Sequence, residues 1–134
     1  MEKTLFNYVS GMIREKLPDV QILEYFSREE REKEYIAVGI SPAGDVAPGM
    51  PFVKMAVVFH AGCNRQEEEK AADRVRELLE VLRNLFRFPV RGAVLKDHIL
   101  DGIVPEGNPG SITVDENDRY IAGELNYTAY ATKP

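Results

Sequence analysis

Large apolar side chains occupy every second position in residues 52–60, and this pattern restricts the fold more than any other feature of the sequence. The segment reads FVKMAVVFH. One alternating set consists of larger apolar side chains: Val53, Met55, Val57 and Phe59. Because successive side chains of a strand point to opposite sides of a sheet, this pattern predicts a β-strand with one apolar face. Residues 118–131, DRYIAGELNYTAYA, alternate in the same way and predict a second long strand.

Two other segments have the spacing of amphipathic helices. In residues 3–17 the apolar positions are Leu5, Val9, Met12, Ile13 and Leu17. Pro18 lacks an amide proton and disfavours helical conformation in the residue before it, so we expect this helix to end at Leu17. In residues 65–87 the apolar positions are Ala71, Ala72, Val75, Leu78, Leu79, Leu82, Leu85 and Phe86. Each helix therefore has one face suited to a core.

The junction HAGCNRQEEE, residues 60–69, leads from the strand at 52–60 into the second helix. We expect His60 to end the strand and Gly62 with Cys63 to form the turn. Asn64, with Glu67 three positions on, has the pattern of a capping box and predicts a helix start at residue 65. The glutamates at 67–69 would then lie in the first helical turn, where negative charge interacts favourably with the helix dipole.

Shorter strands are expected around the two long ones. Residues 20–26 and 35–40 are rich in β-branched and aromatic side chains, and the charged segment 27–34 separates them as a solvated turn or the tip of a hairpin. Residues 41–51 contain three prolines and two glycines, which excludes a helix or a central strand there and predicts an extended arm. Residues 93–105 predict one bent strand or two short ones.

The order of elements predicts an α+β fold for residues 1–134 as one domain. We expect a mainly antiparallel sheet with two helices packed on one face, in the order α-β-β-β-α-β-β. The opposite face of the sheet would carry a mixture of small, polar and apolar side chains: Lys54, Ala56, Val58, Glu124, Asn126, Thr128 and Tyr130. This face is too mixed for a core and rather apolar for contact with water, so we expect a subunit contact there.

Composition argues against several classes of function. The formal net charge is -5 and the sequence pI about 5.1, which opposes binding to a nucleic-acid backbone. A single cysteine excludes an intramolecular disulfide and multi-cysteine metal sites, and it fits an intracellular, reducing compartment. The N-terminus lacks the pattern of a signal peptide, and no apolar run approaches the roughly 20 residues that span a bilayer. We therefore expect neither export by that route nor a membrane span.

His60 and Cys63 are the most reactive-looking residues of the chain. A cysteine nucleophile needs a lowered pKa and an adjacent base, and the three glutamates behind Cys63 oppose a thiolate. A metal site could combine His60 and Cys63 with Asp97, His98 and Asp101, but no paired-ligand spacing is present. No glycine-rich phosphate loop occurs either. We expect no catalytic residue, metal or cofactor, and a small metal-dependent enzyme or ligand-binding domain stays as an alternative.

The closing stretch DENDRYIAGELNYTAY resembles that of the tail terminator proteins of long-tailed bacteriophages, a family that includes minor capsid or tail-completion proteins. In that family a turn, an arginine and an alternating strand lead to an asparagine followed by an aromatic residue, the positions here of Arg119, Asn126 and Tyr127. Asp118 stands where a glycine is common. The order of elements and the proline- and glycine-rich arm add to the resemblance over nearly the whole chain.

The resemblance implies a homo-oligomer, typically a hexameric ring, at the head-proximal end of the tail tube. Such a ring binds the major tail tube protein, ends tail polymerisation and meets the head–tail connector proteins, while DNA passes through its lumen without specific binding. It forms in the host cytoplasm and stays in the virion. The candidate interface residues are Asp45, Val46, Met50, Lys54, Val58, Glu124, Asn126 and Tyr130. Another phage neck or head–tail joining component is the alternative.

Overall fold

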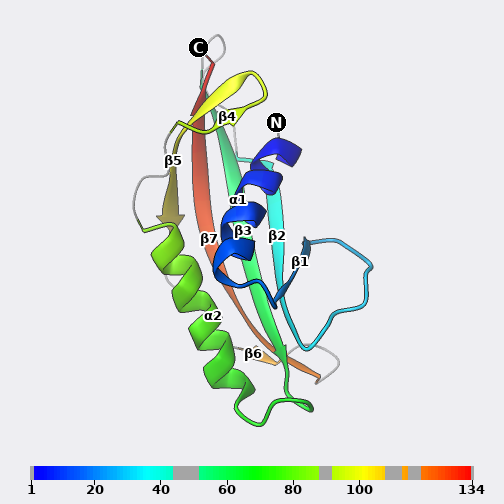
Figure 1. The fold of residues 1–134 in the computed structure, drawn as a ribbon. Helices are drawn as coiled ribbons and strands as arrows, with labels where there is room; N and C mark the ends of the chain where they lie inside the picture. The colour runs from blue at the N-terminus through cyan, green and yellow to red at the C-terminus, as the bar shows by residue number, and fades with distance from the viewer. Residues whose placement is uncertain (1, 44–51, 88–91, 108–112, 115–118, 134) are drawn as a thin grey trace.

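A computed structural model describes residues 2–43, 52–87, 92–107, 113–114 and 119–133 (Figure 1). Their helices and strands follow the chain as α1 (Glu2–Lys16), β1 (Gln21–Glu24), β2 (Glu34–Pro42), β3 (Phe52–Asn64), α2 (Ala71–Leu85), β4 (Val94–Leu95), β5 (His98–Glu106), β6 (Thr113–Val114) and β7 (Tyr120–Thr132). The strands form a single sheet in the order β1-β2-β3-β7-β5-β4, and β6 pairs with β7. Only β1 and β2 pair in parallel; the other described pairs are antiparallel.

Both helices lie on the same face of the sheet, here called the inner face (Figure 1). α1 packs on β2, and α2 packs on β3 and β7. The largest completely buried side chains of this core include Phe59, Phe86, Leu5, Ile13, Ile36, Leu78, Leu82, Leu95 and Leu100. The predicted α+β class, the antiparallel sheet and the placement of both helices on one face are confirmed.

The opposite face of the sheet, here called the outer face, carries no described helix (Figure 1). The register of β3 with β7 places the predicted residues across from one another, as the pairs Lys54–Tyr130, Ala56–Thr128, Val58–Asn126 and His60–Glu124. The neighbouring residues Met55, Val57 and Phe59 are buried against the helices. The period of two therefore predicted both faces correctly.

The junction between β3 and α2 differs from the prediction. β3 does not end at His60: it pairs with β7 as far as Asn64, so Gly62 and Cys63 are buried strand residues. The reason is that β7 extends back to Tyr120 and offers its backbone along this whole length. The prediction of a turn at residues 62–63 was wrong because it treated a local Gly-Cys pair without its partner strand.

The second helix begins at Ala71 and not at residue 65. Asn64 Oδ1 accepts a hydrogen bond from the backbone N–H of Gln66 at 2.8 Å, so Asn64 stabilises a turn after the strand rather than a helix start. The helix cap falls on Lys70, which makes no side-chain capping bond. The glutamates at 67–69 therefore precede the helix, and the predicted role of these three residues at the helix dipole was wrong.

The remaining elements follow the predictions with shifted bounds, except that residues 27–34 are not the tip of a hairpin, because β1 and β2 pair in parallel. The first helix covers Glu2–Lys16, ending before Pro18, and the segment 20–26 contains the four-residue strand β1. The segment 93–105 forms two strands, β4 and β5, which join at a tight turn where Lys96 has a φ of 62°. In the predicted arm, β2 continues through Pro42, and residues 44–51 lie outside the described part of the chain.

Candidate functional site

One half of the outer face is closed by a small apolar cluster of its own. Leu23, Tyr35, Ala37 and Tyr120 are buried there, and Tyr25 packs against them. The connection between β1 and β2 lies over this cluster, because the Tyr120 hydroxyl donates to the backbone oxygen of Arg31 at 2.7 Å. The Arg31 guanidinium also lies 4.9 Å from the centre of the Tyr35 ring. This half of the face therefore has a cover made from the chain itself.

The other half of the outer face has exposed apolar side chains. Val104 on β5 faces Thr128 and is 45% exposed, and Ile99 faces Thr132 and is 37% exposed. Val94, the partner of Ile99 on β4, is 70% exposed. These are three of the four large exposed hydrophobic residues in the described chain. An apolar surface of this kind is a common feature of protein contact sites.

The predicted interface residues are brought together only where they belong to the strands. Five of them lie on the outer face: Lys54, Val58, Glu124, Asn126 and Tyr130. The Lys54 ammonium lies 5.8 Å from the centre of the Tyr130 ring, a weak cation–π contact. The other three, Asp45, Val46 and Met50, lie outside the described residues.

A polar cluster stands between the two halves of the outer face. The Tyr25 hydroxyl donates to Glu124 Oε1 at 2.7 Å, and His60 Nδ1 lies 2.9 Å from the same oxygen. Burial opposes ionisation of Glu124, but the hydrogen bonds from Tyr25 and His60 outweigh it and lower the pKa of the carboxyl. The bond to Glu124 and burial raise the pKa of Tyr25. Glu124 is therefore the acceptor that holds Tyr25 and His60 in place.

The structure separates the residues of the alternative metal or nucleophile site. Cys63 follows the inward-facing positions of β3 and is buried in the core, whereas His60 is on the outer face. His98 is the first residue of β5, and its Nδ1 lies 2.8 Å from Asp97 Oδ1. The next residue, Ile99, pairs with Thr132 at the end of β7. Asp101 bonds to the Thr132 hydroxyl. Among the described residues no three His, Cys, Asp or Glu side chains are grouped to hold a metal.

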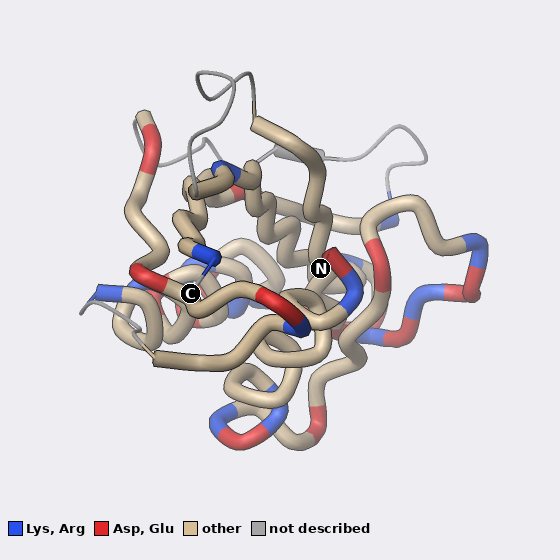
Figure 2. The backbone as a smooth tube through the Cα atoms, turned by 90° about the horizontal axis from the view of Figure 1, so that it is seen from above, with Lys and Arg blue, Asp and Glu red and all other residues tan. Residues whose placement is uncertain are grey.

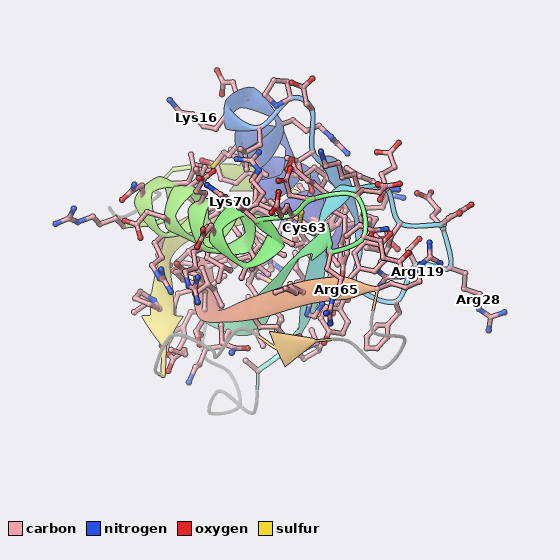
Figure 3. The ribbon with its side chains drawn as sticks, turned by 90° about the horizontal axis from the view of Figure 1, so that it is seen from below. Lys16, Arg28, Cys63, Arg65, Lys70 and Arg119 are labelled. Carbon is pink, nitrogen blue, oxygen red and sulfur yellow. The ribbon has the colours of Figure 1, made fainter. Side chains whose placement is uncertain are left out.

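Cys63 lies on the helix side of β7, below the segment that leads to α2 (Figure 3). Burial raises the pKa of its thiol, and the negative charges of Glu34 and Glu68 act in the same direction. Arg74 on α2 forms a two-pronged ion pair with Glu34, with nitrogen–oxygen distances of 2.6 and 3.1 Å. A buried thiol with a raised pKa is a poor nucleophile, so Cys63 acts here as a core residue.

The residues of the family-like closing motif do not form one site. Arg119 is exposed, and its backbone oxygen accepts a hydrogen bond from the N–H of Arg65 at 2.8 Å, consistent with the two labels lying near each other in Figure 3. Asn126 is exposed on the outer face. Tyr127 is buried on the inner face, where its ring centre lies 5.6 Å from that of Phe59. Of the three side chains, only that of Tyr127 lies in the core.

Sequence reasoning did not identify Tyr25, Val94, Ile99 and Val104 as surface residues of interest. The period of two in β5 is interrupted by a register shift between Leu100 and Gly102, so a count along the sequence does not place Ile99 and Val104 on the same face. Tyr25 follows the end of β1 and reaches Glu124 across 99 positions of sequence. A glutamate within an alternating strand pattern, Glu124, was the only signal in the sequence.

Acidic and basic residues are interspersed along the described backbone (Figure 2). Acidic and basic residues alternate along the projecting connection at residues 28–34 (Figure 2). Three ion pairs follow i,i+3 spacing on α2: Arg74–Glu77, Arg76–Asp73 and Arg83–Glu80. In the described residues no helix is both long and apolar enough to cross a membrane.

Comparisons with known proteins identify the fold alone. No protein-family model matches the chain, and no curated protein matches it. Twelve chains of solved structures do match. One of them aligns with a TM-score of 0.57 over 99% of this chain and 90% of its own length, at 14% sequence identity, and its name describes no activity or partner. This arrangement of helices and strands therefore occurs in solved structures.

Proposed function

We propose that this chain is a structural subunit of a phage assembly, which forms a ring at the head-proximal end of the tail tube, ends tail polymerisation and joins the tail to the head connector. The observation that carries the proposal is the outer sheet face. It is long, lacks a described helical cover, and exposes Val94, Ile99 and Val104 beside the predicted interface residues.

In the described part of the chain the outer face is a regular surface, whereas the candidate catalytic residues lie apart from one another. The outer face is built from paired strands, so its side chains are held at fixed spacing and can match a fixed partner surface. The candidate nucleophile Cys63 is buried, and the candidate base His60 is on the other side of the sheet. A protein with this arrangement is suited to binding rather than to bond cleavage.

A ring also requires two unlike surfaces, because each subunit contacts its two neighbours through different patches. The apolar half of the outer face near β4 and β5 supplies one of these surfaces. The net charge of -5 favours a lumen through which DNA slides without binding.

The experiment is a polymerisation assay with the major tail tube protein of the genome that encodes this chain. Electron microscopy and light scattering would measure tube length and particle mass. We expect a particle with the mass of six 15.1-kDa chains, or a ring seated on one end of each tube, and shorter tubes as the protein concentration rises. A monomer that leaves tube length unchanged would contradict the proposal.

Another neck or head–tail joining component is a second candidate, supported by the same outer face. The two candidates differ in their partner, since a terminator binds the tube end and a connector protein binds the head. Pull-down of the purified chain with tail tubes and, separately, with DNA-filled heads distinguishes them: binding to tubes alone supports the terminator, and binding to heads alone supports the second candidate.

A further inference from the structure

The strand β2 has a free edge beyond the end of β1. β1 pairs with residues 35–38 of β2 and stops, whereas β2 continues to Pro42. The N–H of Tyr25 donates to the Val38 oxygen at 3.0 Å, which shows that Val38 directs its backbone groups toward the β1 side. Because these directions alternate along a strand, Ile40 presents its N–H and C=O on the same side. In the described part of the chain no strand pairs with Ile40 there.

A groove of about 500 Å³ surrounds this free edge. Its walls are the first turns of α1, with Lys3 and Phe6, and the end of β1, with Tyr25 and Phe26. Phe26 is 90% exposed, the most exposed large hydrophobic residue of the described chain. α1 packs on the inner face of β2, and Tyr25 lies over Gly39 on the outer face, so Ile40 lines the groove between these two walls.

Gly39 shapes the floor of the groove. A Cβ atom at this position would lie 3.1 Å from Tyr25 Cβ, which is tighter than ordinary van der Waals contact. The missing side chain allows Tyr25 to lie across the strand, where its hydroxyl reaches Glu124. The groove therefore continues from the strand edge toward Val58 and Glu124 on the outer face.

The groove combines apolar walls with an excess of negative charge. Glu2, Glu24 and Glu124 line it, against the single cation Lys3. The apolar lining comes from Phe6, Phe26, Val38, Ile40 and Val58. A matching ligand would therefore carry apolar groups and positive charge, and it would use its own backbone to satisfy the N–H and C=O of Ile40.

We propose that the free edge of β2 binds an extended peptide segment with alternating apolar and basic side chains, which adds to the sheet as a strand beside Ile40. The occupant is a segment of another polypeptide. Backbone hydrogen bonds to an exposed sheet edge supply affinity in this mode of recognition, and pockets for alternate side chains supply specificity. The inference is independent of the ring, since it concerns the strand edge and not the apolar half of the outer face.

The alternation of an added strand fits the two sides of the groove. One set of its side chains would face the α1 side, with Glu2, Phe6 and Glu24, and the other set would face Val58 and Glu124. Each side thus offers both an apolar contact and a carboxylate. A peptide in which basic residues alternate with valine directs all its valines to one side and all its basic residues to the other, and each side of the groove offers a contact for either set.

The first experiment uses a fluorescent peptide with the sequence VRVKVR and the full-length chain. Fluorescence anisotropy would measure its dissociation constant beside two control peptides: VEVDVE, with opposite charge, and VRVKVR with N-methyl groups on alternate backbone nitrogens. We expect binding of VRVKVR alone, because N-methylation removes the N–H groups that pair with the strand edge. No binding of VRVKVR, or equal binding of its N-methylated form, would overturn the proposal without any change to the protein.

The second experiment changes the edge itself. Ile40→Pro removes the N–H on the free side, and proline is tolerated on an edge strand when its N–H would face outward. We expect peptide affinity to fall by up to about tenfold, the equivalent of one lost hydrogen bond. Ile40→Val keeps the N–H and serves as the control for side-chain size. Equal affinity in Ile40→Pro and Ile40→Val, with both variants folded by circular dichroism, would overturn the added strand.

The third experiment compares two charge-reversal variants. Glu24→Lys reverses a charge in the groove, and Glu29→Lys makes the same change in the exposed turn after Ser27, away from the groove. Only Glu24→Lys should weaken binding of VRVKVR, by several-fold at low salt and less at high salt. Equal effects of the two variants would show attraction to the overall net charge and would overturn the proposed site.

Discussion

The inner and outer faces of the sheet are made by alternate residues of the same strands, yet they differ in almost every physical respect. On β3, Phe59 is completely buried and stacks on Phe86 with ring centres 5.0 Å apart. Its neighbour Val58 faces the outer side and lies across from the exposed Asn126. The inner face is closed by two helices, and the outer face is closed over one half only, by the connection after β1.

Residues on the inner face therefore stabilise the fold, whereas residues on the open half of the outer face are available to bind a partner. Apolar groups on the inner face are already buried within the chain, so changes there should lower the free energy of unfolding. Apolar groups near β4 and β5 on the outer face gain no comparable burial, so changes there should leave folding almost unaffected and alter association instead.

The largest effect is expected from Phe59→Ala. This change removes the centre of an aromatic cluster with Phe86 and Tyr127 and should lower the free energy of unfolding by about 3–5 kcal/mol. The matched change Val58→Ala, one residue away on the outer face, should cost less than about 1 kcal/mol. Urea denaturation followed by circular dichroism measures both. Similar losses for the two variants would contradict the contrast between the faces.

Gly62→Ala tests the closed half of the outer face. A Cβ atom at Gly62 would lie 2.4 Å from Cε1 of Tyr35, whose ring is held by His60 and Tyr120. We expect a loss of about 1–3 kcal/mol, as for other overpacked sites. Gly102→Ala is the control, because a Cβ there meets no atom within 4 Å. Equal thermal stability of the two variants would contradict the tight packing of the Tyr35 ring on Gly62.

Arg74→Gln tests the link between α2 and the sheet. The change removes the two-pronged ion pair with Glu34, and since both side chains are partly exposed we expect a loss of only about 1 kcal/mol. Arg76→Gln removes the exposed pair with Asp73 on the same helix and should change stability by less than about 0.5 kcal/mol. A larger effect of Arg76→Gln in urea denaturation would contradict the assignment of Arg74.

The smallest effect concerns the pH dependence of the polar cluster. The pKa of Glu124 is lowered in the folded chain, so its ionised form stabilises the fold above the pKa of an unfolded glutamate, about 4.3. This stabilisation is lost as the pH falls through the folded pKa. Wild type should therefore exceed Glu124→Gln in stability at neutral pH, with the difference shrinking below pH of about 4. A difference that grows on acidification would contradict the assigned bonds.

Much of the fold follows from short-range patterns in the sequence. The alternation in 52–60 and the apolar stripe through Leu78 and Leu82 place the core correctly, since these patterns depend only on the period of a strand or helix. The order of elements is also predictable, because Pro18 and the charged segment 27–34 interrupt the regular patterns.

Features that depend on distant segments could not be predicted in this way. β3 continues to Asn64 only because β7 pairs with it there, and this pairing overrides the helix-start pattern of Asn64 and Glu67. The contact of Tyr25 with Glu124 needs the removal of a side chain at Gly39 as well as the end of β1. Val104 reaches the outer face through a register shift that no local pattern indicates.

The measurement that tests the central claim most directly is the particle mass of Val104→Lys by light scattering, alone and with tail tubes. Val104 is 45% exposed on the outer face, so a lysine there should leave folding intact while placing a charge in the contact. We predict a ring for wild type and for Asn7→Lys, which adds the same charge at an exposed position of α1, and a folded monomer for Val104→Lys. Rings of Val104→Lys that match wild type would contradict a role of the outer face in assembly.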